Sequence, residues 1–167
     1  MYETPDPGDA LTQGDIVDGC PIFSLDQAAP DEPNPVPRRY RERVVVLTQA
    51  CDLAQDKTSR VVVANVRSCE DLVVAGLMKK STIKDQVRLH KIPGWYILPK
   101  SDGPMTLPES IVNLRDLHTV PRAILEGLAA RGGRIGRVCT PWREHLAQHF
   151  GISYMRIGLP EPYETEP

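Results

Sequence analysis

The residues best suited to chemistry lie together in one run, Arg115-Asp116-Leu117-His118. An imidazole takes or gives a proton near neutral pH, and a guanidinium holds a phosphate group through two hydrogen bonds. His118 is therefore a candidate acid or base, Arg115 is a candidate phosphate ligand, and Asp116 belongs to the same candidate catalytic set. The alternative interpretation is that all three are surface residues at the end of a strand.

A second candidate site is Cys51-Asp52, which comes shortly after the apolar run 44–47. A thiolate at Cys51 is a candidate nucleophile if a histidine such as His90 folds close to it. The sequence gives no reason to expect that approach. The alternative is a small buried cysteine beside an aspartate that accepts hydrogen bonds from backbone N–H groups of a turn.

A third pattern is the pair His145 and His149, which stand four residues apart on a predicted helix. That spacing presents two ligands to a metal, but Trp142, Leu146 and Phe150 share the same side of the helix. The histidines are therefore expected to flank a packing stripe. We identify no third ligand and expect neither a metal nor another cofactor.

Charge is distributed very unevenly along the chain, although its net value is only −2. Residues 1–37 hold eight carboxylates and residues 161–167 hold three, and neither segment contains a lysine or arginine. The intervening residues 38–160 contain all 20 basic residues and carry a net charge of +9. A basic body is compatible with a polyanionic partner, whereas the alternative is that the acidic ends are simply solvated tails.

The length of 167 residues and the 41% apolar content describe a single domain over residues 13–158. Residues 1–12 and 159–167 are expected to be acidic tails, the first of them disordered, and residues 28–37 a proline-rich loop. The longest apolar stretch, residues 72–78, is far below the roughly 20 residues of a membrane helix. We therefore expect a cytoplasmic protein without a membrane partner, and four free cysteines.

Short β-branched runs predict the sheet, and capping signals predict the helices. The expected strands are 14–17, 44–47, 61–64, 95–98, 110–114, 134–138 and 152–157. The expected helices are the first part of 70–88, a segment from Pro121 to about residue 131, and a segment from Pro141 to residue 150. Without a regular β-α-β alternation, this order favours a mainly β, α+β fold: a small barrel or curled sheet with attached helices.

Three segments resemble the MazF/PemK (Kid) toxin family. Gly14-Asp15-Ile16-Val17 resembles the family's opening G-D-[IV]-V strand, and the two valine-rich runs resemble its central strands. The run 110–120 followed by 133–138 resembles "S-V-V-x-x-D-Q-I-R-T-V", a short helix and "I-G-x-L". The resemblance implies an SH3-like barrel with C-terminal helices and a metal-independent endoribonuclease of a toxin–antitoxin pair. It also implies RNA, a protein antitoxin and a second copy of the chain as partners.

The departures from the family pattern fall on functional positions. Arg115 and His118 stand where the family has aspartate and arginine, and Arg67-Ser68 replaces a Thr-Ser pair. An arginine cluster after the acidic loop replaces the family's R-P region. The candidate RNA-binding residues are Arg38, Arg39, Arg41, Arg43 and Arg67.

Two alternatives to an RNA-acting protein stay open. One is a non-catalytic module that binds nucleic acid or protein, and the other is an enzyme dependent on Cys51, within a segment that resembles a T-Q-x-C-D-L signature of uncharacterised bacterial proteins. The charge split also predicts that the acidic N-terminal segment folds back on the basic body and limits access to its groove.

Overall fold

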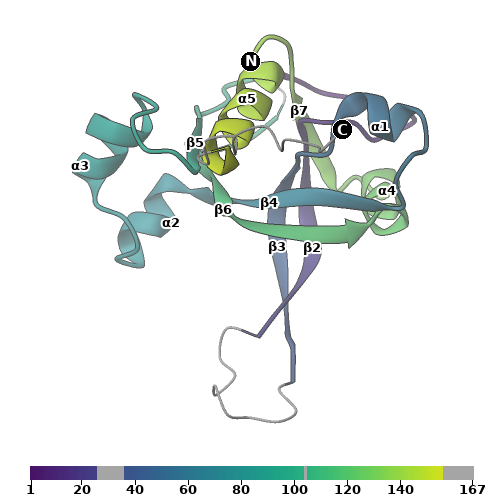
Figure 1. Ribbon diagram of the computed structural model, residues 1–167, viewed down its shortest axis with the longest axis horizontal. Helices are drawn as coiled ribbons and strands as arrows, with labels where there is room; N and C mark the ends of the chain where they lie inside the picture. Colours follow the sequence, from purple (N-terminus) through teal and green to yellow (C-terminus); the bar gives the residue numbers. More distant parts are fainter. Residues whose placement is uncertain (26–35, 104, 156–167) are drawn as a thin grey trace, which may run out of the picture.

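The computed structural model of the chain describes residues 1–25, 36–103 and 105–155. A seven-stranded antiparallel sheet curls into a half-barrel, and helices pack against it (Figure 1). The α+β class predicted from sequence is confirmed, and the curled sheet is compatible with a small barrel. The expected acidic tail 159–167 and residues 28–35 of the proline-rich loop lie outside the described residues.

The strands are β1 (Tyr2–Glu3), β2 (Asp15–Ser24), β3 (Arg38–Val46), β4 (Arg60–Ser68), β5 (Trp95–Leu98), β6 (Ser110–Pro121) and β7 (Arg134–Val138). The helices are α1 (Ala50–Ala54), α2 (Cys69–Val74), α3 (Lys80–Thr82), the π-helical turn η1 (Ile83–Val87), α4 (Arg122–Ala130) and α5 (Trp142–Tyr154). The strands pair in the order β1-β7-β2-β3-β4-β6-β5. No helix in the described parts of the chain is long and apolar enough to cross a membrane.

Strand β4, which pairs with β3 on one side and β6 on the other, has an apolar cluster on each of its faces. Its residues alternate between faces, so Ala64 and Val66 pack in one apolar cluster while Val61 and Val63 pack in another. Leu146 of α5 belongs to the first cluster and Leu125 of α4 to the second. Each of these fully buried leucines contributes about 1.5–3 kcal/mol, which explains why both predicted helices dock on the sheet.

We call the face of the sheet that α4 covers the α4 face. A third apolar cluster lies on this face, at the end away from α4. Leu72 of α2 and Val87 of η1 pack there on Ile97 of β5 and Ile111 of β6. Only the first of these short helical segments, α2, was expected within residues 70–88. The face therefore carries two separate apolar clusters, with the polar middle of β4 and β6 between them.

The pairing of β6 with β4 is interrupted in the middle of both strands. Ala64 pairs with Leu117 and Val66 with Val112, so the four-residue segment 113–116 lies opposite Asn65 alone. Such a bulge changes which residues of a strand point to a given face. As a result, Ile111 and His118 lie across from β4 residues of one face, although their separation along β6 is odd.

The C-terminal end of α5 corrects one prediction from the sequence. Residues 152–157 were expected to form a strand, but α5 continues through Tyr154. The Tyr154 hydroxyl donates to the carbonyl of Leu114 at 2.6 Å, and Ser153 Oγ accepts from the N–H of Gly94 at 3.0 Å. These contacts hold the last helical turn against β6, and residues 156–157 lie outside the described part of the chain.

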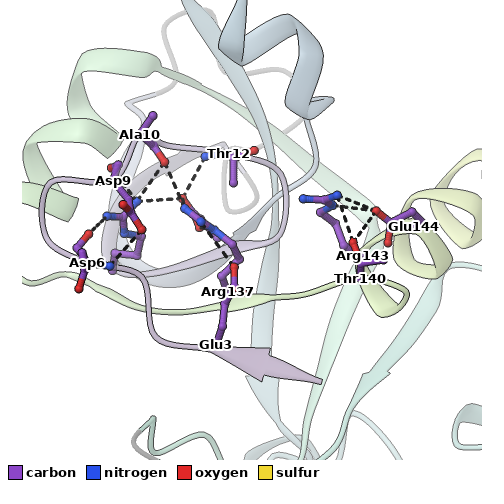
Figure 2. Close-up of polar contacts among 11 residues, drawn as sticks. Glu3, Asp6, Asp9, Ala10, Thr12, Arg137, Thr140, Arg143 and Glu144 are labelled. Carbon is purple, nitrogen blue, oxygen red and sulfur yellow. Dashed lines mark hydrogen bonds and ion pairs between the residues drawn. The ribbon is translucent and has the colours of Figure 1, made fainter.

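The N-terminal segment is held on β7, where the sequence led us to expect a disordered tail. Tyr2–Glu3 pairs with residues 137–138, and the guanidinium of Arg134 donates to the carbonyls of Asp6, Asp9 and Ala10. Arg137 donates to the Ala10 carbonyl as well (Figure 2). The acidic segment thus contacts the basic body, as predicted, but through two arginines of β7.

Candidate functional site

The first polar residue on the α4 face of β4 is Asn65, which continues the row of Val61 and Val63. Its side chain is buried, with only 6% of the residue exposed. The amide nitrogen Nδ2 lies 3.3 Å from Nε2 of His118. The amide oxygen Oδ1 is buried and has no hydrogen-bond partner among the described residues. Buried polar atoms are nearly always hydrogen-bonded, so this oxygen marks a place where a ligand could bind.

His118 lies beside Asn65 because it pairs with Val63, the preceding β4 residue on the same face. Its Nε2 is also 3.5 Å from a carboxylate oxygen of Asp116, and 18% of the side chain is exposed. The bulge in β6 brings Asp116 to this face. The imidazole therefore has a carboxylate and an amide as neighbours and keeps access to solvent, which is an arrangement suited to proton transfer.

A cavity of about 340 Å³ opens beside Asn65 and Asp116, and we call it the notch; His118 contacts both residues but is not part of its lining. Its polar lining consists of Asn65, Arg67, Asn113 and Asp116. Its apolar lining consists of Leu72, Leu77, Met78, Trp95 and Ile111. The notch thus occupies the polar gap between the two apolar clusters of the α4 face.

A wider and shallower groove adjoins the notch, and both are lined by Arg67, Leu72 and Leu77. The groove also contains Arg41 and Arg43, so three of the five arginines predicted to bind RNA lie on one continuous surface. Its charge is mixed, because its lining includes four carboxylates, those of Asp18, Glu42, Glu70 and Asp71.

The three groove arginines differ in how strongly they are engaged. Arg43 forms a two-pronged ion pair with Asp18, and the hydrogen bond with this carboxylate raises the pKa of its guanidinium. Arg67 is held more weakly, because its Nη2 lies 3.9 Å from Oε1 of Glu42 and its side chain is half exposed. Arg41 is exposed and has no ion-pair partner within the described ranges. Arg41 and Arg67 are therefore the cations best placed to meet an anionic ligand.

Arg38 and Arg39 lie at the start of β3, in the long hairpin with β2 that projects from the body of the sheet (Figure 1). They pair in register with Ser24 and Phe23, are exposed, and do not line the notch or the groove. A ligand that contacts both the groove and these two arginines would have to extend along the hairpin.

Arg115 does not line the notch, although it neighbours Asp116 in sequence. Its Nη2 donates to the carbonyl of Pro93 at 2.8 Å, and its guanidinium carbon is 5.8 Å from the centre of the Trp95 ring. The Arg115 side chain fits here because residue 94 is glycine, since a Cβ at that position would lie 2.5 Å from Arg115 Nε. The Arg115 side chain therefore packs against Pro93 and Trp95 and makes no contact with His118.

Cys51 and Asp52 lie at the start of α1, and neither lines the notch. The sulfur is 3.6 Å from the amide oxygen of Gln49 and 3.8 Å from a carboxylate oxygen of Asp52. Cys51 is exposed, which differs from the buried cysteine of the alternative interpretation. His90 packs elsewhere, against His145, so the structure does not show the two partners of a cysteine-dependent site together.

Three histidines gather with Tyr96 between β5 and α5. The ring of His90 is 4.9 Å from that of His145 and 5.7 Å from that of His149. The Tyr96 hydroxyl is 3.1 Å from Nδ1 of His145. Burial, followed by the neighbouring histidines, lowers the pKa of both His90 and His149. In the described parts of the chain, no group of three or more His, Cys, Asp or Glu side chains is arranged to hold a metal ion.

Of the candidates named from the sequence, Asp116 and Arg67 line the notch and His118 contacts Asn65 and Asp116. Asn65 and Asn113 were not among the candidates, and the approach of His90 to the pair His145 and His149 was not expected. The signal for Asn65 was present, since it is the one polar residue in the otherwise apolar run 61–66. Comparison with models of known protein families finds no match, and a search of curated proteins finds none either.

Proposed function

We propose that this chain is a divergent PemK/MazF-like protein that binds single-stranded RNA across the notch and the groove and cleaves it without a metal ion. The observation that carries the proposal is the contact of His118 with Asn65 and Asp116, two residues that line the notch. Arg67, which lines the same notch, and Arg41 in the adjoining groove are placed to meet a phosphate. The segment resemblance and the +9 body point to the same class of ligand.

The proposed reaction uses the 2′-hydroxyl of the RNA as nucleophile. His118 takes the 2′-proton, the 2′-oxygen bonds to phosphorus, and the bond from phosphorus to the 5′-oxygen breaks. The leaving oxygen is protonated by water, so the products end in a 2′,3′-cyclic phosphate and a 5′-hydroxyl. Arg67 stabilises the negative charge that gathers on the phosphoryl oxygens.

The test measures binding and cleavage of a short, labelled, mixed-sequence RNA at low salt in the presence of a chelator. We expect the wild-type chain to bind and cut, and His118→Ala to bind equally while its cleavage rate falls by about 10²–10⁴. Asp102→Ala is the matched control, because Asp102 is exposed and Lys100 is its one ion-pair partner in the described part of the chain. Absence of RNA binding by the wild type, or full cleavage by His118→Ala, contradicts the proposal.

A second candidate function is binding of RNA without cleavage. It is favoured by the positions of two arginines, since Arg43 is paired with Asp18 and Arg115 with the Pro93 carbonyl. Neither then reaches a phosphate held beside His118. Salt-sensitive binding without product formation would select this function, because phosphate contacts weaken as salt rises.

A further inference from the structure

The buried end of the notch carries an unsatisfied hydrogen-bond acceptor. Asn65 Oδ1 has no partner among the described residues, while the Nδ2 of the same amide is 3.3 Å from His118. A buried acceptor without a donor is unfavourable, and a ligand N–H or O–H that reaches it removes that penalty. This oxygen can therefore accept a hydrogen bond from a ligand, and it lies next to the proposed acid–base residue His118.

The polar groups around Asn65 define which ligand edge fits. Asp116 presents a second acceptor to the notch. Asn113 Oδ1 already accepts from the backbone N–H of Arg115 at 3.1 Å, which leaves its amide NH2 as a donor. With Arg67 assigned to the phosphate, the notch offers a base two acceptor groups, on Asn65 and Asp116, and the NH2 group of Asn113 as donor, so a complementary ligand edge carries N–H donors and an acceptor.

The remaining surface of the notch suits a flat ring. Trp95 and Ile111 form part of its apolar lining, and a volume of about 340 Å³ accommodates a nucleobase. Stacking of a base on an aromatic side chain is a common mode of single-strand binding that does not depend on sequence. Selectivity then depends on the amides and the carboxylate.

We propose that the notch holds one nucleobase, through an exocyclic amino group, against Asn65. Adenine, cytosine and guanine each have such a group together with a ring or carbonyl acceptor, whereas uracil has a single N–H between two carbonyls. The chain therefore prefers an amino-bearing base over uracil at the nucleotide next to the phosphate held at His118. This inference rests on the proposed function and adds base selectivity to it.

The test compares oligouridine with the same oligonucleotide carrying one central adenosine or cytidine, with binding measured by fluorescence anisotropy. We expect the wild type to bind the substituted strands about tenfold more tightly, as one recovered hydrogen bond allows. Asn65→Leu keeps the shape of the side chain without its acceptor, and it should reduce the ratio of the two affinities to about one. The control is Gln55→Leu, which removes an exposed amide at the C-terminal end of α1 and should keep the tenfold ratio.

A second measurement does not depend on the folding of the Asn65 variant. In a Trp142→Phe background, Trp95 is the only tryptophan, and cytidine or adenosine should quench its fluorescence more than uridine does. If the wild type binds RNA but all bases bind and quench equally, base selectivity is wrong and the proposed function stands. If the wild type binds no RNA, both are wrong.

Discussion

Replacement of Asp15 by asparagine should destabilise the fold strongly, although Asp15 lies far from the notch in the strand order. Asp15 is fully buried between Arg134 and Arg137, whose side chains are 3% and 13% exposed. Its carboxylate accepts from Arg137 Nε at 2.5 Å, from Arg134 Nη1 at 3.3 Å and from the N–H of Thr12 at 3.0 Å. Removal of this charge leaves the buried Arg134 guanidinium without a carboxylate partner among the described residues, while Arg137 keeps Glu3, whose Oε1 is 3.5 Å from its Nη1.

The magnitude follows from the number of contacts that remain. Loss of one partner of a buried ion pair costs about 3–5 kcal/mol. Arg134 keeps the carbonyls of Asp6, Asp9 and Ala10 as acceptors, so we expect Asp15→Asn to lie at the lower end, at about 3 kcal/mol. The free energy of unfolding is measured by urea denaturation.

The matched control is Asp102→Asn, since Asp102 is 79% exposed and pairs with Lys100 at the surface. Its effect should stay within about 0.5 kcal/mol. Deletion of residues 1–12 removes the Arg134 acceptors as well and should also lower stability. The charge split predicted that this segment limits access to the groove, but none of its residues lines the notch or the groove, so we expect its deletion to leave RNA affinity unchanged. A change below about 1 kcal/mol for Asp15→Asn would refute the buried-triad account.

Three further predictions concern the surroundings of the notch and the cysteines. Gly94→Ala should lower stability by at least about 1–3 kcal/mol in thermal unfolding, because Gly94 has φ +89° and a Cβ would meet Arg115. Burial lowers the pKa of His149 below that of the unfolded chain, so the unfolded state binds the proton more readily, and the free energy of unfolding should fall as pH drops from 7 to 5. His149→Gln should flatten that dependence in urea titrations at both pH values. Under native conditions iodoacetamide should modify exposed Cys51 first, as mass spectrometry would show, while Cys69, whose pKa is raised to about 12 by burial, reacts only on unfolding.

The regular parts of the sheet were predictable because their physical cause is local. The runs Val44–Val46 and Val61–Val63 are β-branched and, apart from the half-buried Val62, buried, and they lie in β3 and β4 as expected. Pro121 directly precedes α4, and the predicted helix end near Gly132 agrees with the last residue of α4, Ala130. Such signals depend on only a few neighbouring residues.

The remaining features depend on contacts between residues distant in sequence. The bulge at 113–116 is defined by the pairing of β6 with the distant strand β4, and the local sequence does not predict it. The last turn of α5 is fixed by hydrogen bonds to Gly94 and Leu114, which the alternating pattern of 152–157 could not reveal. His118 was found from its chemistry, but its neighbour Asn65 is 53 residues away and becomes visible only in the fold.

The most direct test of the central claim is to identify the ends of RNA fragments by mass spectrometry after incubation with the wild type and with His118→Ala. The proposed reaction predicts 2′,3′-cyclic phosphate and 5′-hydroxyl ends from the wild type in chelator, and their loss in the variant. Fragments that end in a 3′-hydroxyl and a 5′-phosphate, or the same fragments from both proteins, would contradict the proposed role of His118 as the base.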